Sequence, residues 1–431
     1  PLGSIGILFA PAIMLVALAL AAALVLHIIT LIYWKRLNPV IPRGLVVWGV
    51  GIAVVVVLAL GFHFLQQSQR QSWLDERRDN WTTEAAADSM TLGANANITL
   101  GYSFVTAEVD DDPRFELRMA ELEALLDADV ETVRIGASGD MRLEEQEPRL
   151  FTSGEQEDDD DEDAPPTEEE LAEAAERISR QQAYEADYMA RLQESGADLH
   201  LSDSQYSPYL LVWSDKDGKI PWEDFATLHE ERIRRYAQEY QPVRYEVVTE
   251  PNAYAEYSGI DLPEDEAEQL ELWVAHTEAL RDAVHETSPE TQVGVAIAIQ
   301  DDFDLDYYER ILALDGIDFI SFRVYQPAAF DVIEDILAER GRPQDNGKEL
   351  WLAETWYGYC LAPQRSMDLD SEWLEVVVAF ALKESISGVM PSDYGCFLQE
   401  GGTLFADTVE VEGRTEVWET WRDLVETWRP S

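Results

Sequence analysis

Val243-Arg244-Tyr245-Glu246-Val247-Val248-Thr249-Glu250 is an extended, largely apolar run that ends in a carboxylic acid, and Pro251-Asn252 follow at once. A second run, Glu349-Leu350-Trp351-Leu352-Ala353-Glu354, is followed by Thr355-Trp356-Tyr357-Gly358. Both patterns predict strands. An acid at the end of an apolar strand is costly to desolvate unless it has a partner or a function. The two glutamates are therefore the first candidates for a functional site.

The regions around these runs predict a repeating order of strand and helix. Strands are expected at 98–105, 131–137, 197–201, 243–250, 292–299, 316–325, 348–354 and 386–392. Helices are expected at 113–128, 167–194, 221–240, 264–286, 305–314, 328–340, 371–384 and 414–428. Eight such units predict an α/β fold, a closed (β/α)8 TIM barrel over 97–431. The alternative is an open doubly wound sheet, but no GxGxxG or P-loop follows the first strand.

Alternation along each strand predicts where the glutamates point. Counting back from Glu250 places Glu246 and Val248 on its face, and counting back from Glu354 places Leu352 and Leu350 on its face. Glu250 and Glu354 then end the fourth and seventh strands and face one mouth of the barrel. Paired carboxylates in such a position suit cleavage of a glycosidic bond. The alternative is that both are surface or ion-paired strand ends.

The two runs also resemble known motifs. Tyr245 to Pro251 is similar to the strand-4 motif Phe-Glu-x-x-Asn-Glu-Pro of the retaining (β/α)8 glycoside hydrolases called clan A. Ala353 to Gly358 resembles their strand-7 motif. The resemblance implies that Glu250 is the acid/base and Glu354 the nucleophile. Thr249 stands where many members have Asn.

The same resemblance implies further site residues. Arg134 is similar to a strand-2 arginine that keeps the nucleophile ionised, and Tyr325 to a tyrosine that hydrogen-bonds it. For each, a structural ion pair or a packing role is the alternative. The remaining substrate-binding candidates lie within or shortly after predicted strands, and they are Tyr102, His200, Asp203, Asn252, Trp356 and Asp393.

The composition is strongly acidic. The 431 residues carry 85 acidic and 31 basic side chains, a formal net charge of −54. This balance argues against a nucleic-acid partner, because phosphate binding needs a basic face. It is typical of proteins from extreme halophiles, and the expectation is a halophilic archaeon, where concentrated salt screens the self-repulsion of an acidic surface.

The N-terminal region predicts a membrane anchor over 1–66. The apolar runs 5–34 and 45–65 are each long enough to span a bilayer as a helix; a buried hairpin is the alternative. The short loop between them is basic, which places it in the cytoplasm and the rest of the chain outside. Residues 67–96 are expected to form a stalk. Sequons at Asn80 and Asn97 agree with an extracytoplasmic location.

Two other features bear on the barrel. The acidic segment at about 154–168 predicts a solvated, disordered insertion, with a divalent-ion site as the alternative. Cys360 and Cys396 follow the seventh and eighth strands, where they form a disulfide or remain two free thiols. Neither Cys/His spacing nor a cofactor motif is present, so no metal or cofactor is expected.

The sequence therefore predicts a membrane-embedded protein of the cell membrane whose outer barrel is an O-glycosyl hydrolase or transglycosidase with a glycan substrate. The second hypothesis is a catalytically inactive barrel that binds glycan. The third is a subunit of a membrane complex or oligomer formed through the two spans.

Overall fold

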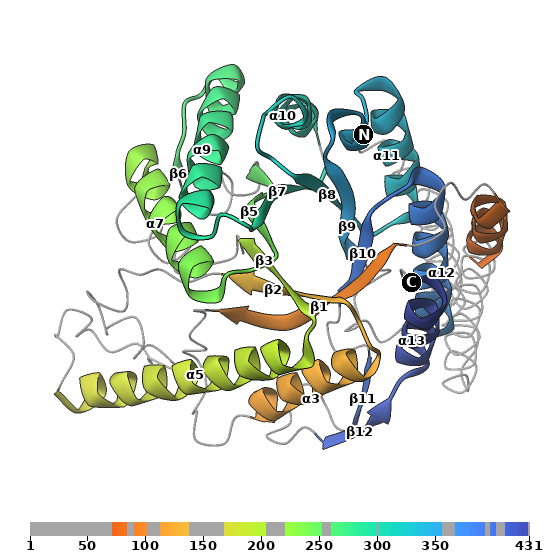
Figure 1. Cartoon of the computed structure of the whole chain (residues 1–431), viewed down its shortest axis with the longest axis horizontal. Coiled ribbons are helices and arrows are strands. Elements are labelled where there is room, and N and C mark those ends of the chain that lie inside the picture. The colour runs from red at the N-terminus through yellow and green to blue at the C-terminus, as the bar shows by residue number, and fades with distance from the viewer. Residues whose placement is uncertain are drawn as a thin grey trace, which may run out of the picture. The chain divides into compact units, whose positions relative to one another are not determined.

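The computed structural model describes residues 71–83, 90–100, 113–137, 168–203, 220–251, 260–299, 301–355, 367–392, 397–401 and 410–429. Eight parallel strands close into a barrel in the order β1-β10-β9-β8-β7-β5-β3-β2. Figure 1 looks into this ring, with the helices arranged outside it. The expected (β/α)8 fold is confirmed, and the open sheet is excluded by the closed strand order.

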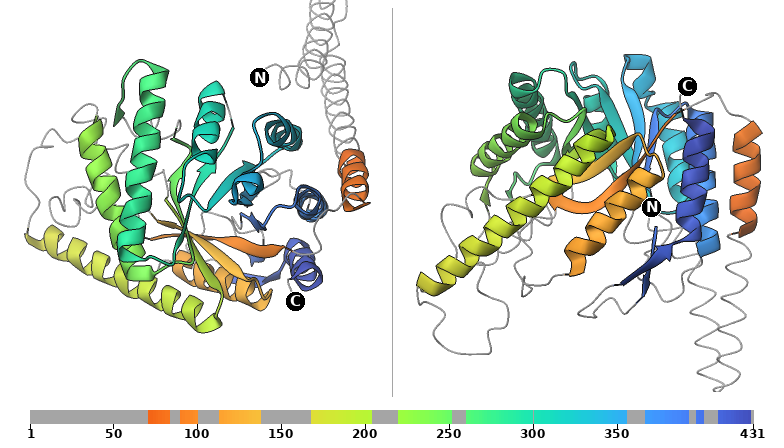
Figure 2. Two further views of the ribbon diagram at one scale, coloured as in Figure 1. Left: turned by 45° about the horizontal axis from the view of Figure 1, so that its top comes forward. Right: turned by 60° about the horizontal axis from the view of Figure 1, so that its bottom comes forward.

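A helix follows every barrel strand. The strands are β1 (Thr91–Leu100), β2 (Thr132–Ala137), β3 (Asp198–Asp203), β5 (Arg244–Thr249), β7 (Gln292–Ile297), β8 (Phe319–Val324), β9 (Glu349–Thr355) and β10 (Gly388–Pro391). The helices are α3 (Pro113–Asp127), α5 (Glu168–Ser195), α7 (Trp222–Tyr240), α9 (Glu266–Thr287), α10 (Asp302–Leu312), α11 (Pro327–Glu339), α12 (Met367–Glu384) and α13 (Glu416–Trp428). Figure 2 shows α3 and α5 running side by side along one flank.

Five short elements of the described chain lie outside this alternation. β4 (Ile220–Pro221) pairs with β6 (Ile260–Asp261), and β11 (Leu398–Gly401) pairs with β12 (Glu410–Arg414). A 3-10 helix, η4 (Pro343–Asn346), precedes β9. Several helices begin at side-chain caps; Asp265, for example, accepts hydrogen bonds from the backbone N–H groups of Ala267 and Glu268.

Aromatic side chains fill the barrel interior where the neighbouring strand carries glycine. Phe319 and Trp351 are fully buried there with Ala353 and Met390. A Cβ atom on Gly388 would lie 2.2 Å from the Trp351 ring. These contacts show that the rings occupy the space that a side chain on the neighbouring strand would need.

The first strand lies further towards the N-terminus than the sequence predicted. β1 begins at Thr91, within the segment assigned to the stalk, whereas the pattern placed the strand at 98–105. Its inward positions include Gly93, which has no space for a side chain beside Thr132, and the polar Asn95. The usual alternation of apolar residues is therefore missing from β1.

A helix covers residues 71–83. Its Trp81 is 2% exposed and packs against Phe330 of α11 and Phe380 of α12, with ring centroids 5.2 and 5.0 Å away. Arg78 also forms an ion pair with Glu375 of α12 at 2.7 Å. Residues 78–83 are thus part of the barrel domain.

Among the residues that the structure describes, no helix is both long enough and apolar enough to cross a bilayer. The expected spans at 5–34 and 45–65 lie outside the described residues, as does the acidic insertion at about 154–168.

Candidate active site

A buried ion pair forms the floor of the candidate site. Arg134 of β2 donates to the Oε2 atom of Glu246 of β5 from Nη2 at 2.7 Å and from Nε at 2.9 Å. Ser321 of β8 donates to the other oxygen at 2.6 Å. Burial raises the pKa of Glu246, but Arg134, His200 and Ser321 together hold it well below its usual range. Glu246 is therefore a permanent anion inside the barrel.

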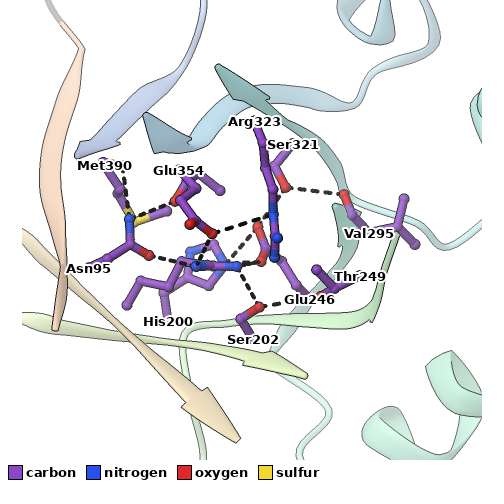
Figure 3. A network of polar contacts seen from close by, with 12 residues as sticks. Asn95, His200, Ser202, Glu246, Thr249, Val295, Ser321, Arg323, Glu354 and Met390 are labelled. Atoms are coloured by element: carbon purple, nitrogen blue, oxygen red, sulfur yellow. Dashed lines mark hydrogen bonds and ion pairs between the residues drawn. The ribbon is translucent and has the colours of Figure 1, made fainter. Parts of the chain in front are cut away.

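Two more side chains fix the orientation of Arg134. Its Nη1 donates to Asn95 of β1 and its Nη2 to Ser202 of β3, both at 2.6 Å. The Asn95 amide in turn donates to the Ala353 and Met390 carbonyls at 2.8 and 2.9 Å. Figure 3 shows this network. Because β1, β3, β5, β9 and β10 all contribute groups to this network, Arg134 of β2 is held in one position.

Glu250 reaches the barrel mouth through an unusual backbone. A register shift between Glu246 and Val248 places one extra residue in β5, and Thr249 then lies 3.4 Å from the inward-facing Ser202 hydroxyl. Glu246 and Glu250 both contact arginines inside the barrel, as expected, but the prediction that Val248 shares their face is wrong. Glu250 follows with φ +52°, a conformation that costs about 1–3 kcal/mol in a non-glycine residue.

The positive φ of Glu250 differs in setting from the other left-handed non-glycine residues in the described chain. Asp129, Gln241 and Ser385 lie one or two residues after the end of a helix, where a left-handed residue is a common way to end the helix. Glu250 instead follows a strand. The strain is consistent with a functional constraint on the direction of this carboxylate.

Glu354 also reaches the mouth through a register shift. Counting back predicted that Leu350 and Leu352 share its face, and that prediction is wrong. Trp351 and Ala353 face the barrel interior, with Trp351 6.0 Å from the His200 ring. The β8–β9 pairing shifts between Phe322 and Arg323, so that Arg323 lies opposite Glu354. This irregularity turns Glu354 inward as well.

Glu354 lies among groups that favour its ionised form. Burial raises the pKa of Glu354, but the guanidinium groups of Arg323 and Arg134 outweigh burial and lower it from its usual value. Hydrogen bonds from Tyr325 and Ser392 act in the same direction. Arg134 lies 3.6 Å from Glu354 Oε2, so its main partner is Glu246. Tyr325 is the partner that the sequence predicted.

Arg323 of β8 joins the two candidate catalytic residues. Its Nη1 lies 2.7 Å from Glu250 Oε1 and its Nε lies 3.4 Å from Glu354 Oε2. Because a guanidinium is a rigid planar fork, these two oxygens lie no more than about 9 Å apart. That limit covers both the shorter separation of retaining glycosidases and most of the inverting range. The carboxylates therefore converge on one mouth.

The sequence analysis missed Arg323. Ser321, Arg323 and Tyr325 alternate along β8, and all three contact inward-facing carboxylates. This alternation was the available signal. It was overlooked because an arginine in a strand is more often read as solvent-exposed than as the partner of two buried acids.

Two predicted substrate contacts lie elsewhere. His200 is fully buried in the barrel, 3.5 Å from Glu246, and burial lowers its pKa, so the imidazole is neutral at neutral pH. Asp203 lies on the opposite face of β3. It forms an ion pair with Arg232 of α7 at 2.6 Å and lies 3.1 Å from His229. Asp203 is thus a buried partner of a helix and not part of the mouth, because alternation turns it away.

Other predicted residues lie outside the described residues. They are Tyr102, Asn252, Trp356, Asp393, Cys360 and Cys396. Asn80 is exposed on the helix at 71–83, and Asn97 lies within β1. Within the described ranges, no group of three or more His, Cys, Asp or Glu side chains is arranged to hold a metal ion.

Comparison with known proteins gives a likeness of structure alone. No protein-family profile and no curated sequence matches this chain. Among solved structures, a β-glucosidase from Thermotoga maritima in complex with noeuromycin is similar, with 9% identity and a TM-score of 0.48. The alignment covers 81% of this chain and 100% of that one. A family 1 β-glucosidase from the same organism gives 9% identity, 80% and 100% coverage, and a TM-score of 0.49.

Proposed function

We propose that this chain hydrolyses or transfers glycosidic bonds by a retaining double displacement, with Glu354 as the nucleophile and Glu250 as the acid/base. The observation that supports this most directly is the convergence of both carboxylates on the Arg323 guanidinium at the end of the barrel strands. The C-terminal ends of barrel strands are where TIM-barrel enzymes place their catalytic groups.

The proposed first step uses Glu354 as an anion. Its carboxylate attacks the anomeric carbon while the bond from that carbon to the leaving oxygen breaks, and Glu250 gives its proton to that oxygen. Arg134 and Arg323 favour the ionised form of Glu354, and Tyr325 and Ser392 direct it by hydrogen bonds. A carboxylate held in this way is ready to act as a nucleophile.

The second step returns both residues to their starting state. Glu250, now ionised, takes a proton from water or from an acceptor hydroxyl, and the resulting oxygen displaces Glu354 from the sugar. Two inversions at the anomeric carbon give net retention. Thr249, buried beside Ser202, takes the position that the related motif gives to Asn, and offers one hydroxyl in place of an amide.

The test is hydrolysis of a panel of aryl glycosides in molar salt by the wild type, Glu354→Ala and Glu250→Ala. Each substitution is expected to lower kcat on the order of 10²–10⁴-fold, the usual contribution of acid/base and nucleophilic groups. Glu271→Ala is the matched control, because Glu271 is an exposed carboxylate paired with Arg310 away from the mouth. It should leave turnover unchanged.

Leaving-group dependence separates a chemical role of Glu250 from a structural one. A general acid matters less as the leaving group improves, so Glu250→Ala should lose least on dinitrophenyl glycosides and most on poor leaving groups. An equal loss on every leaving group would contradict the acid role. Equal turnover by wild type and Glu354→Ala would remove the assigned nucleophile.

The second candidate function is a catalytically inactive barrel that binds glycan. The observation that favours it is the position of Arg323, which contacts both carboxylates and leaves neither one without a cation. Glycan binding by the wild type, without turnover of any sugar in the panel, would support this function.

We further propose that the barrel is held at the outer face of the cell membrane of a halophile by the two apolar runs, 5–34 and 45–65, and that these runs also offer a surface for a membrane complex. Their length and the basic loop between them support this topology. Protease added to intact cells should cleave the barrel domain; complete protection would contradict the proposed orientation.

A further inference from the structure

Arg323 is shared between two acids, whereas Arg134 is fully committed. Arg134 donates hydrogen bonds to Glu246, Asn95 and Ser202. The Arg323 side chain is 10% exposed, and its buried Nε makes only the 3.4 Å ion-pair contact with Glu354, without the alignment of a hydrogen bond, among the described residues. Arg323 is therefore the guanidinium that can change partner at the lower cost.

The charges around the mouth do not balance. Glu246, Glu250 and Glu354 face two cations, Arg134 and Arg323, from β5, β9, β2 and β8. Among the described residues, Tyr325 also contacts Glu354, and the buried neutral His200 lies beside Glu246. These described groups carry one excess negative charge. An added anion is accommodated among them at lower cost if a proton enters with it.

Glu250 and Glu354 retain different ion partners if Arg323 moves to a ligand. Glu354 retains Arg134 at 3.6 Å and the hydrogen bonds from Tyr325 and Ser392. For Glu250, Arg323 is the one cationic partner within the described residues. Loss of Arg323 therefore destabilises the ionised form of Glu250 more than the ionised form of Glu354.

We propose that Arg323 recognises an acidic sugar, through a uronate carboxylate or a sulfate ester, and that its transfer from Glu250 to the anion of the sugar is coupled to the uptake of one proton by Glu250. One anion and one proton enter the site together, so the net charge of the site does not change. The proposal rests on the proposed function, because the proton taken up is the one that the general acid then donates to the leaving oxygen.

The test is calorimetric titration of the full chain at constant molar salt with three non-hydrolysable phenyl thioglycosides. These carry glucuronate, 6-sulfated glucose and glucose, so that the carboxylate and the sulfate are tested separately against a neutral sugar. Repeating each titration in buffers of different ionisation enthalpy gives the number of protons taken up. At least one acidic sugar should bind on the order of tenfold or more tightly than glucose, since a hydrogen bond to a charged group contributes at least that much.

Arg323→Gln and Glu250→Gln should change the affinity for the acidic sugar in opposite directions. Arg323→Gln should bind the acidic and the neutral sugar equally. Glu250→Gln carries a neutral side chain in place of the protonated acid, so it should bind the acidic sugar more tightly than the wild type and take up no proton, against about one for the wild type. Arg310→Gln, a change at an exposed ion pair, is the control and should match the wild type.

Equal affinity of the wild type for acidic and neutral sugars, no binding of any of them, or proton uptake that persists in Glu250→Gln would overturn the proposal. If Arg323→Gln does not fold, Glu250→Gln alone still decides. Hydrolysis is scored separately. Turnover of neutral glycosides that depends on Glu354, without acidic preference, would keep the proposed enzyme and remove the role of Arg323. Proton-coupled binding of an acidic sugar without turnover of any glycoside would keep the role of Arg323 and remove the proposed enzyme.

Discussion

The buried pair of Arg134 and Glu246 should be among the most sensitive positions in the barrel. Glu246 is fully buried, the Arg134 side chain is 8% exposed, and two hydrogen bonds join them. Glu246→Gln keeps the volume but removes the charge, which leaves Arg134 with Glu354 at 3.6 Å as its nearest remaining carboxylate. Breaking a buried pair in this way costs about 3–5 kcal/mol of unfolding free energy.

The size of the effect is tested by a double-mutant cycle in urea, which leaves the ionic strength constant in molar salt. The double variant Arg134→Met with Glu246→Leu removes both charges and places apolar atoms in a similar volume. Replacing a whole buried pair is often neutral or stabilising, so the double variant should lose less stability than Arg134→Met and Glu246→Leu lose in sum. We expect a coupling free energy of at least about 2 kcal/mol.

The control is the half-exposed pair of Arg234 and Glu230 on α7. Glu230→Gln should change the unfolding free energy by less than about 1 kcal/mol, as is usual for surface pairs. A loss of similar size for Glu246→Gln, or a coupling free energy near zero, would refute the view that this pair is the permanent floor of the site.

Three further predictions concern the scaffold. Gly388→Ala places a Cβ 2.2 Å from the Trp351 ring and should lower the unfolding free energy by about 1–3 kcal/mol, with partial recovery when Trp351→Phe is added; no recovery would contradict the packing. Trp81→Ala empties a site between Phe330 and Phe380 and should cost about 3–5 kcal/mol in urea unfolding, and a loss under 1 kcal/mol would show that the helix is dispensable. Burial and His229 hold the pKa of His276 well below its usual 6.5. The contribution of the neutral imidazole to the unfolding free energy is therefore present above pH 6.5 and is lost as the pH falls below 6.5. His276→Gln should therefore lose less stability than the wild type between about pH 7 and pH 5, by up to about 1.4 kcal/mol per pH unit, and equal slopes would contradict this.

The pattern of the sequence predicts most of this fold because buried strands and amphipathic helices leave periodic signals. β2, β3, β5 and β7 to β10 lie within a few residues of the expected runs, and each expected helix is present. β1 is the exception, since its Gly93 and Asn95 face a crowded, polar part of the interior. The need to leave room for other side chains removed the apolar pattern that predicts a strand.

The site was less predictable for a different reason. Strand ends correctly drew attention to Glu250 and Glu354, but the register shifts near Val247 and Ala353 reverse the alternation that strict counting assumes. The partner of each acid also depends on which strands are neighbours in the closed sheet. For that reason Arg134 was expected on Glu354 but binds Glu246 more closely, and Arg323 was not expected at all.

A retaining double displacement requires that Glu354 form a covalent bond with the sugar. This bond can be detected by mass spectrometry of the wild type after incubation with activated 2-deoxy-2-fluoro glycosides of neutral and acidic sugars, in which the fluorine slows release of the intermediate. We expect one glycosyl unit on the peptide that contains Glu354, and no label in Glu354→Ala. A label on another residue, or turnover of the parent glycosides without any labelled intermediate and with Glu354→Ala as active as the wild type, would contradict it.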